Sequence, residues 1–311
     1  MAVRFWWFFF LAFAFTLSTV AQDRPSPIQI STRPIQAFVD LVLVRVGVTD
    51  LMHRPVMDLS EKDFALFEDN EQQPIKYFYE EDPPISVAMV LDMSGSMKTR
   101  VDLLRDSIDQ FFENANPRDE YYVVTVGSKP ELLAGPARSS EEIQNKLLGV
   151  RPTGWTALMD SIALAALELK HARHERKVLL IFSDGGENSS RYTEREVRNL
   201  VEESDLDAYA IGIFDDPLPF FRPLERKLGM AVLNRITNVT GGRAVPVNRV
   251  TRIPEVAAAL SRELRHQYVL GYQPQEDSEG RFRKIKVELN SGEKAKVLRT
   301  YYRKNYWRGN N

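Results

Sequence analysis

Between Ile85 and Arg265, apolar strand-like runs alternate with amphipathic helix-like segments. Four of the runs are almost continuously apolar, as in strands that are covered on both faces: ISVAMVLD, YYVVTV, KVLLIFSD and LDAYAIGIF. Between them, apolar residues recur at helical spacing, which is typical of helices that pack through one face. This alternation predicts an α/β fold with a doubly wound, mainly parallel sheet of the Rossmann-like kind.

The two flanks of this part have a different pattern. From Gln36 to Tyr79, short β-type runs with partial alternation are separated by polar turns, and after Arg265 the runs HQYVLGYQP, FRKIKVEL and KVLRTYY are separated by turns that contain glycine. About three short strands at either end are marginal for independent stability. We therefore predict that residues 35–82 and 266–304 pack together as one β-rich domain flanking residues 83–265, with a polar tail over 305–311.

Residues 1–21 have the order of a secretory signal peptide. Arg4 precedes an apolar run from Phe5 to Leu17, and small residues follow, with Thr19 and Ala21 placed for cleavage after Ala21. The apolar run is short for a membrane span, which needs about 20 residues; an uncleaved anchor is the alternative. Residues 22–34 are polar and proline-containing, as in a linker. We expect a secreted or periplasmic protein with no membrane span once the signal is removed.

Composition excludes several classes of function. Lys and Arg number 41 and Asp and Glu 43, a net charge of −2, whereas a nucleic-acid-binding protein needs a basic excess. The chain has no cysteine, which excludes disulfides, thiolate metal sites and cysteine nucleophiles. Of its four histidines, His171 and His174 have helical spacing, but their charged neighbours favour a solvated helix end over a metal site.

Oxygen-bearing side chains gather at the predicted ends of the buried strands. Asp92 ends the first strand, and Ser94 and Ser96 follow it in a glycine-containing turn. Thr156 lies just before a later helix, and Asp184 ends a later strand. Ligands of doubly wound sheets bind beyond the carboxyl ends of the strands. Two carboxylates and three hydroxyls suit a hard divalent cation, with Mg²⁺ first and Mn²⁺ or Ca²⁺ next.

Other interpretations of these residues are weaker. Asp, Ser and Thr at strand-to-helix junctions are ordinary helix N-caps. A capping role would explain any one of the five residues, but it explains the presence of all five together less well. A serine nucleophile would need a Gly-x-Ser-x-Gly turn or a histidine in a matching loop, and neither is present. An aspartyl phosphotransferase would usually have a second carboxylate at the position of Ser94.

The pattern Asp92-x-Ser94-x-Ser96, followed by Thr156 and Asp184 in the matching order, resembles the metal-ion-dependent adhesion site of von Willebrand factor A-like domains. All five positions of that pattern are present. The resemblance implies that Ser94, Ser96 and Thr156 bind the metal directly or nearly so. It implies that Asp92 and Asp184 bind largely through water.

The resemblance extends over about residues 85–265. The flanking segments Asp58–Phe64 and Tyr268–Tyr272 resemble the β-rich ends of a bacterial secreted group of such proteins. The family resemblance thus agrees with the α/β pattern of the middle of the chain and with the β pattern of its two ends.

A site of this kind has an incomplete coordination sphere. Two carboxylates only neutralise a divalent ion, so an acidic residue of a partner protein can fill the open position. We predict an exported, metal-dependent protein-binding module for adhesion or complex assembly, and not an enzyme. The alternatives are a binder of a small acidic ligand and a metal-dependent hydrolase with Glu187 as its base.

The segment from Phe214 to Gly229 is expected to be a loop beside the metal. It is rich in proline and carries the adjacent aromatic residues Phe220 and Phe221. These rings belong either to the protein's own core or to an apolar surface that selects the partner.

Overall fold

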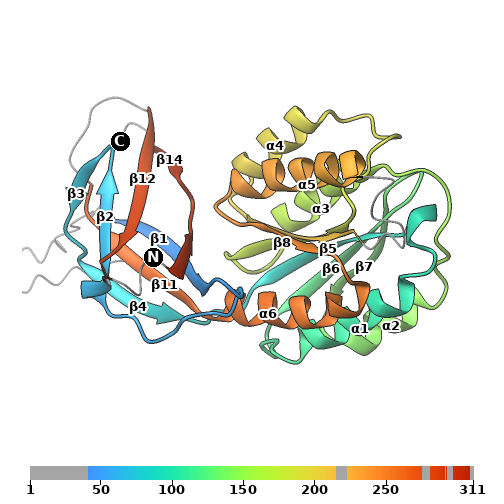
Figure 1. Cartoon of the computed structure of the whole chain (residues 1–311), viewed down its shortest axis with the longest axis horizontal. Helices are drawn as coiled ribbons and strands as arrows, with labels where there is room; N and C mark the ends of the chain where they lie inside the picture. Colours follow the sequence, from blue (N-terminus) through green and yellow to red (C-terminus); the bar gives the residue numbers. More distant parts are fainter. Residues whose placement is uncertain (1–40, 215–222, 275–280, 291, 293–296, 309–311) are drawn as a thin grey trace, which may run out of the picture. The chain divides into compact units, whose positions relative to one another are not determined.

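The computed structural model describes residues 41–214, 223–274, 281–290, 292 and 297–308 (Figure 1). The predicted signal peptide (1–21) and linker (22–34) lie outside these residues. Within the described ranges, no helix is both long and apolar enough to cross a membrane.

A six-stranded sheet in the order β10-β9-β8-β5-β6-β7 forms the centre of the α/β part. Five of its strands are parallel, and β7 pairs antiparallel with β6 at one edge. The prediction of a doubly wound, mainly parallel sheet is confirmed. The strands are β5 (Ser86–Asp92), β6 (Glu120–Val126), β7 (Glu131–Ala137), β8 (Lys177–Ser183), β9 (Asp207–Ile213) and β10 (Ala244–Val247).

Helices cover both faces of this sheet, as Figure 1 shows. One core lies under α1, α2 and α6 and includes Leu104, Ile143 and Leu260; the other lies under α3, α4 and α5 and includes Ile162 and Val197. Burial on both faces explains why the strands read as continuous apolar runs. The helices are α1 (Val101–Phe112), α2 (Ser140–Leu147), α3 (Leu158–Lys170), α4 (Glu194–Glu203), α5 (Pro223–Asn238) and α6 (Ile253–Arg265).

Strands from the two ends of the chain pair with one another. The orders are β13-β1-β11-β4 in one four-stranded sheet and β14-β12-β2-β3 in another. Side chains of both sheets share a core that includes Val46, Leu66, Leu270 and Ile285. The strands are β1 (Val42–Asp50), β2 (Phe64–Glu68), β3 (Glu71–Gln73), β4 (Tyr77–Glu81), β11 (Gln267–Tyr272), β12 (Arg281–Leu289), β13 (Leu298–Tyr301) and β14 (Asn305–Arg308).

Two segments differ from their sequence-based predictions. The tail from residue 305 includes strand β14, which pairs with β12, because Tyr306 contributes to the shared core despite its polar neighbours. The predicted loop Phe214–Gly229 is helical from Pro223 onward. A proline is compatible with the first turn of a helix, because the backbone N–H that it lacks would have no partner within the helix there. Phe220 and Phe221 lie outside the described residues.

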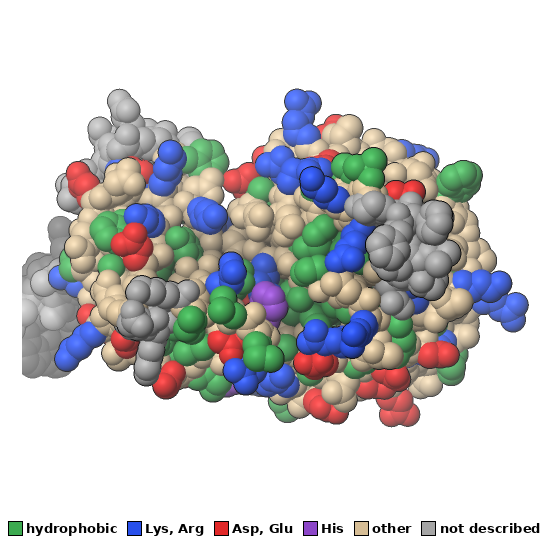
Figure 2. Space-filling model, in the orientation of Figure 1, with side chains coloured by type: hydrophobic (Ala, Val, Ile, Leu, Met, Phe, Trp, Pro, Cys, Tyr) green, Lys and Arg blue, Asp and Glu red, His purple; other side chains and the backbone are tan. Residues whose placement is uncertain are grey.

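Acidic and basic side chains are interspersed on the face of the molecule shown in Figure 2. This face is therefore not divided into one large basic region and one large acidic region. A nucleic-acid-binding face would carry a continuous basic stripe.

Candidate metal centre

The first part of the candidate centre is the loop that leaves β5. Asp92 is fully buried at the end of the strand, and its Oδ1 accepts a 3.0 Å hydrogen bond from the backbone N–H of Ser94. A short 3₁₀ helix, Gly95–Met97, follows, and the buried side chain of Met97 holds this turn against the core. The Oγ atoms of Ser94 and Ser96 lie 3.0 Å apart. The loop therefore places one carboxylate and two hydroxyls in one cluster.

The end of β8 adds a second carboxylate. Asp184 is half-buried, and its Oδ2 accepts a 3.4 Å hydrogen bond from Ser96 Oγ, while Oδ1 accepts one of 2.8 Å from the N–H of Gly186. Gly185 has φ +76°, and a Cβ there would lie 2.4 Å from the carbonyl oxygen of Gly229 in α5. The loop after β8 thus needs glycine both for its backbone conformation and for its close approach to α5.

Ser183, which the sequence analysis did not single out, joins the two strand ends. Its Oγ donates a 2.7 Å hydrogen bond to Oδ2 of Asp92 and accepts one of 3.0 Å from the N–H of Gly185. A serine at the end of an apolar strand gives little signal in one sequence, because small polar residues at such positions are also common turn formers.

Thr156 lies on a third loop that is tied to both of the others. The carbonyl of Gly154 accepts a hydrogen bond from the N–H of Gly95, and the N–H of Thr153 donates to the carbonyl of Met93. Thr156 and Asn188 are joined by two hydrogen bonds. The side-chain oxygen of Asn188 accepts a 2.8 Å hydrogen bond from the backbone N–H of Thr156, and the backbone carbonyl of Thr156 accepts one from the backbone N–H of Asn188. The structure therefore links Asp92, Ser94, Ser96 and Asp184 by side-chain hydrogen bonds and fixes the Thr156 loop against them through backbone contacts.

The two carboxylates have no cationic partner in the described part of the chain, where neither Asp92 nor Asp184 forms an ion pair with Lys or Arg. Burial and then the nearby charge of Asp184 raise the pKa of Asp92, and the hydrogen bonds from Ser94 and Ser183 oppose this effect only in part. A divalent cation would supply the missing positive charge. The donors are all oxygen, as a hard cation such as Mg²⁺ requires.

Histidine does not contribute to this cluster. Among the described residues, no three His, Asp or Glu side chains gather in a way that would hold a metal by themselves. His174 instead lies at the opposite end of the α/β part, where its Nε2 is 2.8 Å from the carbonyl oxygen of Arg118. The donor set at the strand ends is thus two carboxylates supplemented by hydroxyls.

Glu187 is used to hold the loop after β8 in place. Its two carboxylate oxygens accept hydrogen bonds from the N–H of Met159 at the start of α3, from the N–H groups of Ser189 and Ser190, and from Ser190 Oγ. Burial tends to raise the pKa of Glu187, but these hydrogen bonds outweigh it and lower that pKa below its usual value. A carboxylate with four donors and a lowered pKa is poorly suited to act as a general base.

Trp155, immediately before Thr156, is the large apolar side chain that the sequence analysis missed at this edge. Its side chain is 66% exposed, and its backbone N–H donates a 3.0 Å hydrogen bond to Ser128 Oγ. The sequence did offer a signal for this residue, because it is a tryptophan in an otherwise polar loop. A tryptophan that stays exposed in such a loop has a role other than core packing.

The matches to known proteins agree with this fold. The sequence model of the von Willebrand factor type A domain matches residues 87–187, a range that contains all five residues of the candidate centre. A comparison with curated protein sequences found no match.

Solved structures with similar folds include an animal protein and a bacterial one. Proximal thread matrix protein 1 from the mussel byssus has a TM-score of 0.51 and 17% identity over 64% of this chain and 51% of its own. A von Willebrand factor type A protein from Catenulispora acidiphila has a TM-score of 0.48 and 12% identity over 81% of this chain and 75% of its own. This chain thus spans about half the length of the mussel protein.

The family match and the similar solved structure point to the same fold. The α/β part of this chain has a von Willebrand factor A-like fold, residues 87–187 match the sequence model of that family, and the candidate centre lies at the carboxyl ends of β5 and β8.

Proposed function

We propose that this chain is an exported, metal-dependent protein-binding module, in which a divalent cation bridges to an acidic residue of a partner protein. The observation that carries the proposal is the cluster at the ends of β5 and β8. There, hydroxyls and carboxylates are linked to one another, and two neighbouring carboxylates have no cationic partner among the described residues.

The five side chains would share the work of holding the cation. Ser94, Ser96 and Thr156 are proposed as direct ligands, and Asp92 and Asp184 as ligands acting largely through water. The bound cation supplies positive charge at the surface. The chain's own contribution is to hold the oxygens in place through Ser183 and Asn188, whose hydrogen bonds fix Asp92 and the Thr156 loop.

The partner is expected to contact the metal from outside the sheet edge. Ser96 is exposed and Asp184 half-buried, so one side of the cluster is open to solvent. Trp155 lies beside it as an exposed aromatic residue, and such residues often contribute strongly to binding at protein interfaces. An acidic side chain at the metal and an apolar side chain against Trp155 form a reasonable minimal partner surface.

Binding is favoured over hydrolysis because Glu187, the base that a hydrolase would need, already accepts four hydrogen bonds from its own loop and from α3. Export and the signal peptide rest on the sequence pattern of residues 1–21. The partner could be part of an adhesive surface or of another exported complex.

Metal binding can be tested by calorimetry with Mg²⁺, Mn²⁺ and Ca²⁺ on the full chain and on two variants. Asp92→Ala should abolish binding of one divalent cation. Asp106→Ala, an exposed carboxylate on α1 away from the cluster, is the matched control and should bind as the wild type does. Unchanged Mg²⁺ and Mn²⁺ affinity in Asp92→Ala would refute the proposed centre.

Partner binding can be tested by capture from the exported fraction of the source cells in Mg²⁺ and in EDTA. A protein retained only with Mg²⁺ should be lost with Asp92→Ala. Trp155→Ala should weaken its retention while leaving calorimetric Mg²⁺ binding intact. If Mg²⁺ binds but the retained proteins are the same in EDTA, the centre is a metal site without the proposed bridging role.

A further inference from the structure

A second feature, remote from the metal centre, is an open strand edge beside a large pocket. β1 pairs with β11 through Val42–Val46 and with β13, on its other edge, through Gly47–Asp50. After β13 the chain leaves for the other sheet, where the carbonyl of Lys304 accepts a hydrogen bond from the N–H of Ile285. The edge of β1 over Val42–Val46 that faces away from β11 therefore has no strand beside it among the described residues.

This open edge forms one wall of a pocket of about 940 Å³. Five consecutive residues, 41–45, line it. Successive side chains of a strand point to opposite faces, so consecutive residues share a pocket only if the edge of the strand borders it. The volume is at the upper end of the range of ligand-sized pockets.

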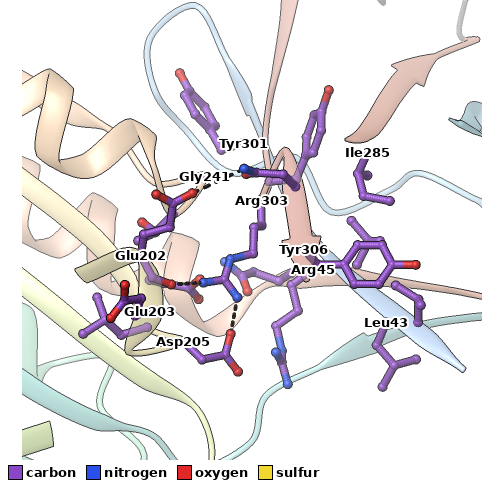
Figure 3. A pocket seen from close by; sticks show the side chains of 18 of the residues that line it. Leu43, Arg45, Glu202, Glu203, Asp205, Gly241, Ile285, Tyr301, Arg303 and Tyr306 are labelled. Carbon is purple, nitrogen blue, oxygen red and sulfur yellow. Dashed lines mark hydrogen bonds and ion pairs between the residues drawn. The ribbon is translucent and has the colours of Figure 1, made fainter. Parts of the chain in front are cut away.

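The walls of the pocket differ in chemistry. Figure 3 shows Leu43 and Ile285 on one side and Glu202, Glu203 and Asp205 on the other. Leu43 is 43% exposed, and Leu41 and Phe282 add further exposed apolar surface to the lining. The pocket can thus accept apolar side chains along β1 and polar ones toward α4.

The polar wall has an excess of negative charge. Arg303 forms an ion pair with Asp205, and the charges of Arg176 and Arg45 act on Asp207. Within the described ranges, Glu202 and Glu203 form no ion pair, and they stand in the last turn of α4, where the helix dipole adds partial negative charge. This wall therefore favours a cationic side chain.

We propose that this pocket binds an extended segment of a partner protein, which adds as a strand to the open edge of β1 over Val42–Val46. Backbone hydrogen bonds to β1 provide the alignment, as in other cases of strand addition. Alternate side chains of the segment face the apolar wall, and a Lys or Arg on it faces Glu202 and Glu203. The site is separate from the metal centre, so binding here does not depend on a divalent cation.

The test uses a short peptide of alternating valine and lysine, with blocked ends and long enough to cover Val42–Val46. Isothermal calorimetry with the full chain in EDTA should show binding. The same peptide with alternate backbone nitrogens methylated should bind about tenfold more weakly or not at all, because it cannot donate to the edge of β1. A peptide of alternating valine and glutamate should also bind more weakly.

Variants and hydrogen exchange locate the site. Glu203→Lys should weaken binding of the valine–lysine peptide about two- to fivefold, whereas Glu141→Lys, the same charge change on exposed α2, should leave it unchanged. Amide exchange in residues 42–46 should slow when the peptide is bound. Absence of binding, equal binding of the methylated peptide, or exchange that slows elsewhere but not in β1 would each overturn the proposal.

Discussion

Ser183 Oγ donates a 2.7 Å hydrogen bond to Oδ2 of Asp92, although the two residues lie on different strands. The bond is buried, and it joins the end of β8 to the end of β5 directly beneath the candidate metal centre. The position of Asp92 therefore depends on a side chain that is not among the five proposed ligands. Groups that orient metal ligands in this way commonly affect metal affinity as strongly as some ligands do.

Ser183→Ala should weaken Mg²⁺ binding about tenfold and lower the free energy of unfolding by about 1–3 kcal/mol, because buried Asp92 loses a donor. Calorimetry and urea unfolding measure the two effects. Ser161→Ala is the control, since Ser161 is equally buried but donates only to the carbonyl of Ala157, the residue that caps the start of α3. It should lose some stability and keep its Mg²⁺ affinity. Equal Mg²⁺ affinities in both variants would show that Ser183 does not position Asp92.

The closeness of the Asp92 and Asp184 carboxylates leads to a prediction about the stability of the folded chain with Mg²⁺ and in EDTA. With Mg²⁺ at about 100 times its dissociation constant, the wild type should gain about 2.7 kcal/mol over its stability in EDTA. Asp92→Asn should gain much less. In EDTA, however, the variant should unfold at nearly the same temperature as the wild type. The relief of repulsion between two carboxylates is offset there by the loss of one of the two acceptor oxygens that Ser94 and Ser183 use. Thermal unfolding in both conditions checks this difference, and an equal Mg²⁺ shift in the two proteins would contradict it.

Most of the fold can be predicted from the sequence, because burial on both faces leaves long apolar runs such as Val178–Phe182 that few other structures explain. The sequence analysis does not predict the edge strand β7, because this strand is not buried on both faces and has no long apolar run. It includes Gly135 and Pro136 and leaves Leu132 39% exposed, a composition that an edge tolerates and a central strand does not. Helix α2 is likewise short and polar, with only Ile143 and Leu147 buried.

Sequence analysis finds the members of the candidate centre more easily than the groups that support them. Asp92, Ser94 and Ser96 stand close together in the chain, so their convergence follows from one turn. Ser183 and Asn188 act through contacts between loops that are far apart in sequence, and no local pattern marks them. The open edge of β1 depends on where β13 ends, which is likewise a property of the tertiary structure.

We expect Glu187 to make the free energy of unfolding depend on pH. Its pKa is lowered in the folded chain, so the folded state releases this proton at a lower pH than the unfolded state does. The resulting stability is present above the usual glutamate pKa, near 4.5, and is lost as the pH falls through the lowered value. Glu187→Gln should therefore cost about 1 kcal/mol at pH 7 and much less at about pH 3. Urea unfolding at both values measures the difference.

Glu141→Gln, on exposed α2, is the control for that experiment and should change stability little at either pH. A cost of Glu187→Gln that does not begin to fall as the pH drops below 4.5 would mean that the ionised carboxylate is not what holds the loop.

The division of the chain can be tested with a fragment of residues 83–265. We predict that it folds on its own, because the two cores on either side of the central sheet are built almost wholly from residues within it. Removal of the flanks takes away the contacts of Arg243 with His53 and Tyr301, but Arg243 keeps its buried ion pair with Glu263. The fragment should therefore be less stable than the full chain and still unfold cooperatively.

The same fragment should bind Mg²⁺ with nearly the affinity of the full chain, because every proposed ligand and both supporting side chains lie between residues 92 and 188. It should not bind the valine–lysine peptide, because β1 is absent. Urea unfolding and calorimetry on the fragment measure these properties. A fragment that fails to unfold cooperatively, or that folds but no longer binds Mg²⁺, would show that the β-rich ends are an integral part of the metal-binding domain rather than a second domain beside it.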